Sequence, residues 1–157
     1  MATDYFLKLD SIPGESADSK FKGEIDIQGF SLGAQNSGSM AHGGGGGAGR
    51  VEYLNVSISK RVDKASPKLL ELVSNGKHIA KAELFCRKQG GEQMVFYTVT
   101  LTDVLVTSVS QNGASHDHLL ETITFDFGKF EEKYTAQDAK GNKAGDVAMA
   151  WNIKENK

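Results

Sequence analysis

The chain has 157 residues, of which 39% are hydrophobic and 24% charged, with a formal net charge of −2. This length favours a single domain over residues 1–157, large enough to bury a core without disulfides. The charge argues against a nucleic-acid partner, which needs clustered Lys and Arg, and no apolar run approaches the ~20 residues of a membrane-spanning helix.

Period-two alternation of apolar and polar residues dominates the chain and predicts β-strands. The first strand is expected at residues 5–9. A second, near residues 25–32, changes its apolar phase at Gly29, and a glycine at such a point indicates a bulge or bend. Later strands are expected near residues 54–59, 78–87, 95–102, 119–127 and 147–153, with turns at Gly90-Gly91, Gln111-Asn112-Gly113 and Lys140-Gly141-Asn142.

One segment has the signals of a helix. Ser66 is a favourable N-cap, Pro67 suits the first helical position, and Gly76 suits the C-cap. The expected buried face is formed by Leu69, Leu70, Leu72 and Val73. Together these elements predict a mainly β fold: an antiparallel β-barrel of roughly eight strands with one short α-helix packed on its side.

A glycine-rich loop is predicted between two strand-like segments, at residues 38–50. It consists of Gly38, Ser39, Met40, Ala41, His42, Gly43, Gly44, Gly45, Gly46, Gly47, Ala48, Gly49 and Arg50. Because glycine loses the most backbone entropy on ordering, such a loop either stays mobile or is ordered by something outside itself. It does not match a phosphate-binding loop, since Arg50 replaces the lysine, Val51 lacks a hydroxyl, and a strand follows instead of a helix.

The other reactive side chains form no catalytic pattern. His116 and His118 could point the same way, but no third metal ligand has suggestive spacing. Cys86 shares the apolar phase of its strand and is expected to be a small buried residue. The sequence therefore predicts no enzyme activity, no metal and no cofactor.

Several blocks of the sequence resemble the Hcp family, the tube protein of bacterial type VI secretion systems. The resemblance runs in order through almost the whole chain. Its blocks are residues 4–9, 12–16, 27–33, the glycine-rich loop, 63–69, 76–78, 88–92, 120–127 and 150–153.

The resemblance implies a structural subunit that forms homohexameric rings, which stack head to tail into a hollow tube. A contractile sheath drives that tube, tipped by a VgrG spike, into a neighbouring cell. The lumen would carry and chaperone secreted effectors. The protein would be cytoplasmic when assembled and leave through the type VI system, since its N-terminus has no signal-peptide pattern.

Within this hypothesis, the loop at residues 38–50 is expected to contact the adjacent ring, because mobile segments can become ordered on docking. Gln28 and Ser31, polar residues on the strand before the loop, are candidates for the lumen face. Two alternatives remain open: a monomeric β-barrel that binds a small ligand in an apolar pocket, and an enzyme that uses the glycine loop.

Overall fold

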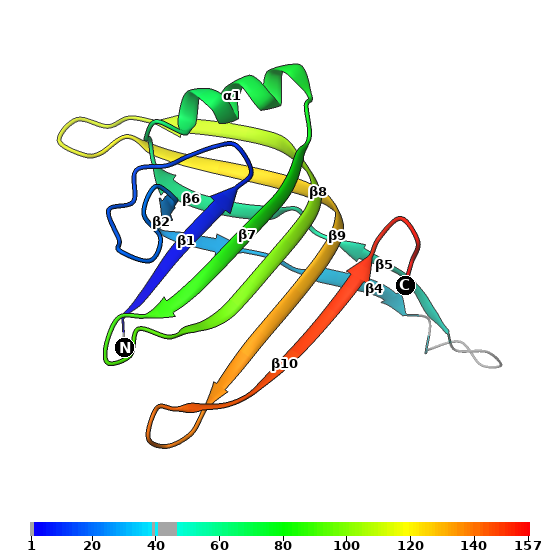
Figure 1. Cartoon of the computed structure of the whole chain (residues 1–157). Helices are drawn as coiled ribbons and strands as arrows, with labels where there is room; N and C mark the ends of the chain where they lie inside the picture. The colour runs from blue at the N-terminus through cyan, green and yellow to red at the C-terminus, as the bar shows by residue number, and fades with distance from the viewer. Residues whose placement is uncertain (1, 39, 41–46) are drawn as a thin grey trace.

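The computed structural model describes residues 2–38, 40 and 47–157, which form ten β-strands and one α-helix (Figure 1). In chain order the elements are β1 (Thr3–Leu9), β2 (Ile25–Ile27), β3 (Gly29–Ser31), β4 (Ala34–Gly38), β5 (Ala48–Tyr53), β6 (Val56–Arg61), α1 (Ser66–Asn75), β7 (Ile79–Lys88), β8 (Val95–Asn112), β9 (Leu120–Gln137) and β10 (Lys143–Asn152).

Eight strands form one antiparallel sheet that curves into a barrel. Its order is β2-β1-β7-β8-β9-β6-β3, and β10 pairs with β9. Strands β2 and β3, at the two ends of this order, are separated in sequence by Gln28 alone. The backbone N–H of Gln28 donates to the carbonyl of Ser59 at 2.7 Å, so one continuous segment joins both ends of the sheet. The predicted barrel with one short helix is therefore confirmed.

The phase change at Gly29 coincides with a change of strand partner. Before it, β2 pairs with β1 and buries Ile25 and Ile27. After it, β3 pairs with β6, and Phe30 packs against the margin of the core. The bend expected from the sequence thus lies where the chain passes from one end of the sheet to the other.

The two longest strands, β8 and β9, bend together at Asp103 and Gly128. Asp103 has a left-handed φ of 56°, and a side chain at Gly128 would meet the Cβ of Asp103 at 3.4 Å. Up to this bend β9 pairs with β6, and beyond it β9 pairs with β10. The bend therefore separates the part of β9 that closes the barrel from the part that carries β10.

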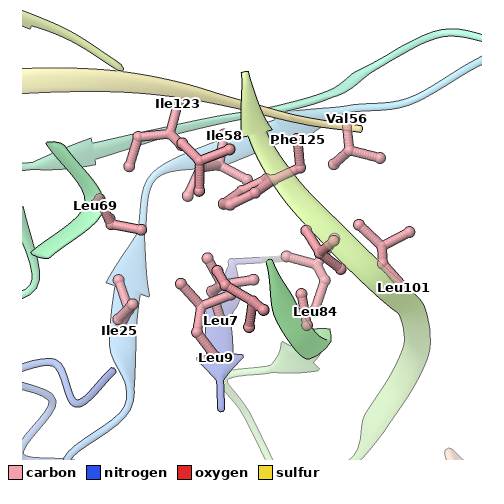
Figure 2. Close-up of a cluster of buried hydrophobic side chains, with 14 of the residues drawn as sticks. Leu7, Leu9, Ile25, Val56, Ile58, Leu69, Leu84, Leu101, Ile123 and Phe125 are labelled. Carbon is pink, nitrogen blue, oxygen red and sulfur yellow. The ribbon is translucent and has the colours of Figure 1, made fainter. Parts of the chain in front are cut away.

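The core fills the barrel, and α1 lies across one end of it (Figure 1). Figure 2 shows Leu69 of α1 among strand side chains that include Ile25 and Ile123. Leu72 is also buried, but Leu70 is 45% exposed, so its predicted place on the buried face is wrong. Helical geometry explains this, because residues spaced three or four apart share a face and Leu70 lies a quarter-turn from Leu69.

A buried ion pair fixes the start of α1. Lys60 and Glu121 are almost fully buried and their charged atoms lie 2.8 Å apart. Ser66, expected to be the N-cap, is instead the first helical residue after the cap residue Ala65. Its hydroxyl donates to Glu121 at 2.6 Å, and Asp63 accepts the Ala65 N–H. The N-cap prediction is wrong because a distant strand supplies the partner that Ser66 uses.

A second cluster holds the long segment between β1 and β2 against the barrel. The guanidinium of Arg87 lies over the rings of Phe6 and Phe21 and bonds Asp4 and Asp18. The hydrogen bond from Arg87 lowers the pKa of Asp18 from 3.8 to about 2. The Asp18 carboxylate is therefore ionised at neutral pH and stays paired with Arg87.

We expect Lys60→Met to destabilise the fold by about 3–5 kcal/mol, because it leaves the Glu121 carboxylate buried without its cation. Adding Glu121→Leu should recover much of that loss. The free energy of unfolding, measured by denaturant titration at one fixed protein concentration, checks both. Lys129→Met is the control, since Lys129 pairs with Glu131 at the surface and its loss should cost less than about 1 kcal/mol. Equal losses for Lys60→Met and Lys129→Met would contradict this account.

Candidate assembly surfaces

The interior of the barrel leaves no room for a ligand in the described part of the chain. A cavity between Leu7, Leu84 and Phe125 measures only about 10 Å³, whereas small-molecule sites measure roughly 300 Å³ or more. A filled barrel of this size has no internal channel. Any binding function must therefore use outer surfaces, and three of them have distinctive chemistry.

The first surface is a two-stranded hairpin that projects from the barrel (Figure 1). It is formed by β4 and β5, and all β4 side chains are exposed. Side-chain bonds from Gln35 to Glu52 and from Asn36 to the Gly49 carbonyl, both 2.8 Å, link the two strands.

The hairpin contains the ends of the predicted glycine-rich loop. Gly38 lies at the end of β4, while Ala48, Gly49 and Arg50 belong to β5 and so are strand residues. Met40 is 83% exposed, and Gly47 also lies outside any strand. Ser39, Ala41, His42, Gly43, Gly44, Gly45 and Gly46 lie outside the described residues.

Tyr53 and Arg50, both on β5, connect this hairpin to the body of the protein. The ring of Tyr53 packs on Phe127 and Phe130, with centroid distances of 5.9 and 5.3 Å. Further along β5, the guanidinium of Arg50 donates to the carbonyl of Ile153 at 3.1 Å. The hairpin is therefore attached at the core and again at the C-terminal segment.

The second surface, which we call the hydroxyl face, spans four neighbouring strands on the outside of the barrel. Strand pairing aligns short uncharged residues in two rows, from β3 through β6 and β9 to β8. One row is Ser31, Ser57, Thr124 and Ser108, and the other is Gly29, Ser59, Thr122 and Ser110.

Short hydrogen bonds order one edge of the hydroxyl face. The hydroxyl of Thr124 lies 2.6 Å from those of Thr107 and Ser108, and Asn55 donates to Thr107. Because these hydroxyls bond one another and none of the eight aligned residues is charged, the surface is polar without strong attraction for either charge sign.

The two residues expected at a lumen occupy different places on this surface. Ser31 is exposed and belongs to the hydroxyl face, whereas Gln28 is exposed beside Ser59, at the margin. The other members were missed by sequence reasoning, since Ser57, Ser108 and Thr124 become neighbours only through the register of separate strands. Their alternation with buried residues was the available signal.

The third surface is the edge strand β10. Eight of its ten residues are exposed, on both faces of the sheet. Val147 is 72% exposed and Met149 42%, and Tyr134 opposite Val147 is 48% exposed. Within the described residues, β10 pairs with β9 alone. A long apolar edge strand of this kind is a template for association with another chain.

Other residues that carry reactive groups lie apart from these surfaces. His116 and His118 are exposed near the turn before β9. Cys86 is buried, as expected, and burial raises the pKa of its thiol to about 12. Among residues 2–38, 40 and 47–157, no three His, Cys, Asp or Glu side chains gather closely enough to hold a metal, and no helix is long and apolar enough to cross a bilayer.

Comparison with known proteins identifies the family. A family model described as "Type VI secretion system effector, Hcp" matches residues 6–134. Protein hcp1 of Pseudomonas aeruginosa is 44% identical over 159 aligned positions, covering 99% of this chain and 98% of that protein. A solved type six secretion system protein superposes with a TM-score of 0.95 at 32% identity, covering 99% of both chains. Hcp1 from Salmonella typhimurium superposes with a TM-score of 0.80 at 31% identity, again over 99% of both chains. The chain therefore belongs to the Hcp family of type VI secretion proteins.

Proposed function

We propose that this protein is the non-catalytic subunit of a type VI secretion tube. Copies form a hexameric ring, rings stack head to tail into a hollow tube, and the lumen carries and chaperones effectors. The tube is assembled in the bacterial cytoplasm, with a contractile sheath around it and a VgrG spike at its tip. It leaves the cell through the type VI system.

The exposed strand β10 is the observation that carries the proposal of a ring. Within the described residues the outer edge of β10 has no partner strand, and the side chains of Val147 and Met149 are exposed and apolar. Soluble monomers usually cover such an edge or place charged residues on it. In a ring, the strand would lie against a different surface of the neighbouring copy. Such a heterologous contact, repeated with a rotation that closes, produces a ring.

The hydroxyl face is suited to line the lumen of that ring. A conduit for cargo must be wetted by water and must not hold any one cargo by charge. Ser31, Ser57 and Ser59 provide such a lining, together with their partners on β8 and β9. Gln28, at the margin, would lie near an opening of the lumen.

The β4–β5 hairpin is suited to connect one ring to the next. It projects beyond the barrel, and its β4 side chains have no cover in the described chain. Stacking is a second heterologous contact, and it propagates without limit unless capped. The alternative of a monomeric barrel that binds a small ligand would have to place that ligand on an outer surface, because the described interior is filled.

We expect Val147→Asp to dissociate the ring, because it would place an unpaired carboxylate in an apolar contact. A buried unpaired charge costs about 3–5 kcal/mol, which weakens each contact by roughly 100-fold or more. Native mass measurement on the purified protein checks this. Leu70→Asp is the control, because Leu70 is also an exposed apolar residue but lies on α1, and this variant should leave the ring intact. A persistent ring in Val147→Asp, or equal dissociation of the control, would count against β10 as the ring contact.

Deletion of Gly43–Gly47 should leave rings intact while tube growth and secretion fail, because it removes part of the loop at residues 38–50 that we propose contacts the next ring. Native mass reports the ring, electron microscopy reports tubes, and the amount of protein in the culture medium reports secretion. Replacing the same residues with five serines is the control for length, and it should retain tube growth. Normal tubes after the deletion would exclude the stacking role.

A further inference from the structure

We propose that residues 153–157, which follow β10, form a strap that holds the β4–β5 hairpin in one orientation. Lys154 and Asp103 are then positioning residues, which act on the hairpin through the strap and not through direct contact. The effect of the strap on tube growth rests on the proposed stacking role. Its effect on the hairpin itself does not.

The strap has a defined shape at the end of the chain. The backbone N–H of Asn152 donates to the backbone oxygen of Lys157 at 2.8 Å, and the Lys157 N–H donates back to the carbonyl of Asn152 at 3.3 Å. The N–H of Glu155 donates to the side chain of Asn152 at 3.1 Å. These bonds close residues 152–157 into a turn.

The strap is fixed at the bend that β8 and β9 share. The Ile153 N–H donates to the Gly128 carbonyl at 3.0 Å, and Ile153 packs against the core. The ammonium group of Lys154 pairs with the Asp103 carboxylate, whose other oxygen lies 2.7 Å from Nδ1 of His78. The hydrogen bonds from Lys154 and His78 lower the pKa of Asp103 to about 2, so its carboxylate is ionised at neutral pH.

The side chain of Lys154 lies close to Gly128 and Asp103 at this bend. A Cβ atom on Gly128 would meet Lys154 Cε at 3.3 Å and the side chain of Asp103 at 3.4 Å. Glycine at position 128 leaves room for the Lys154 side chain to pass over β9 and reach Asp103. The carbonyl of Ile153, next to Lys154, is held in place as a result.

That fixed carbonyl is the acceptor for Arg50 of the hairpin, at 3.1 Å. A two-stranded hairpin is only marginally stable by itself. Tyr53 anchors its base to the core, and Arg50 lies about 10 Å further along the strand. One anchor at the base leaves a hairpin free to swing, whereas a second anchor at that distance restrains its direction.

Hydrogen exchange in the intact ring tests the strap. Lys154→Met and Arg50→Met each keep an apolar stem but remove one link, so amides of β4 and β5 should exchange several-fold to about tenfold faster. Asp103→Asn should act like Lys154→Met, since asparagine tolerates the left-handed backbone at this position. Lys157→Met is the matched control, because Lys157 pairs with Glu155 within the strap.

The strap is supported if the three variants accelerate exchange in β4 and β5 while exchange in β1 and β7, the ring mass and the Lys157→Met control stay unchanged. It is overturned if exchange in β4 and β5 matches the parent protein in Lys154→Met and Arg50→Met. Tube growth is scored separately by electron microscopy. Faster hairpin exchange with normal tubes would support the strap and would count against the stacking role.

Discussion

A barrel of this size must fill its interior with its own side chains, and every functional surface of the protein follows from that constraint. Phe125, Ile58 and Ile123 are almost fully buried inside the barrel, and α1 lies over one end. The protein therefore acts through its outer faces and edges. A hollow conduit requires several copies, because one copy cannot enclose a channel.

The sequence predicted most strands of the barrel because alternation of apolar and polar residues is a local signal, but it did not predict the hairpin strands β4 and β5. Alternation of apolar and polar residues marked the strands, and Gly29 marked the point where the chain changes partners. The errors at Ser66 and Leu70 have a different origin. Ser66 bonds Glu121, which is 55 residues away, and such a partner overrides the local preference for a capping role.

The assembly surfaces were harder to predict because they depend on register and on what covers each face. Ser31 was identified as polar, but its row with Ser57, Thr124 and Ser108 exists only after three strand pairings are fixed. Val147 and Met149 alternate with other residues as core residues do. Alternation alone does not say whether their side chains are buried by the same chain or by another copy. The strap at residues 153–157 has no sequence signal, since its acceptor for Arg50 is a backbone carbonyl.

If the hydroxyl face lines the lumen of a closed ring, as we propose, large reagents can reach it only from inside that ring, and cysteine labelling of rings measures this access. Cys86 gives little background, because it is buried and its thiol pKa is raised. Ser59→Cys would report the hydroxyl face, and Ser74→Cys on α1 would report a surface outside it. A small maleimide should label both variants in every subunit. A large polyethylene-glycol maleimide should label Ser74→Cys fully but only a minority of the Ser59→Cys subunits, because one bulky group obstructs the lumen for the next. Equal labelling of both positions by the large reagent would show that the hydroxyl face does not line the lumen.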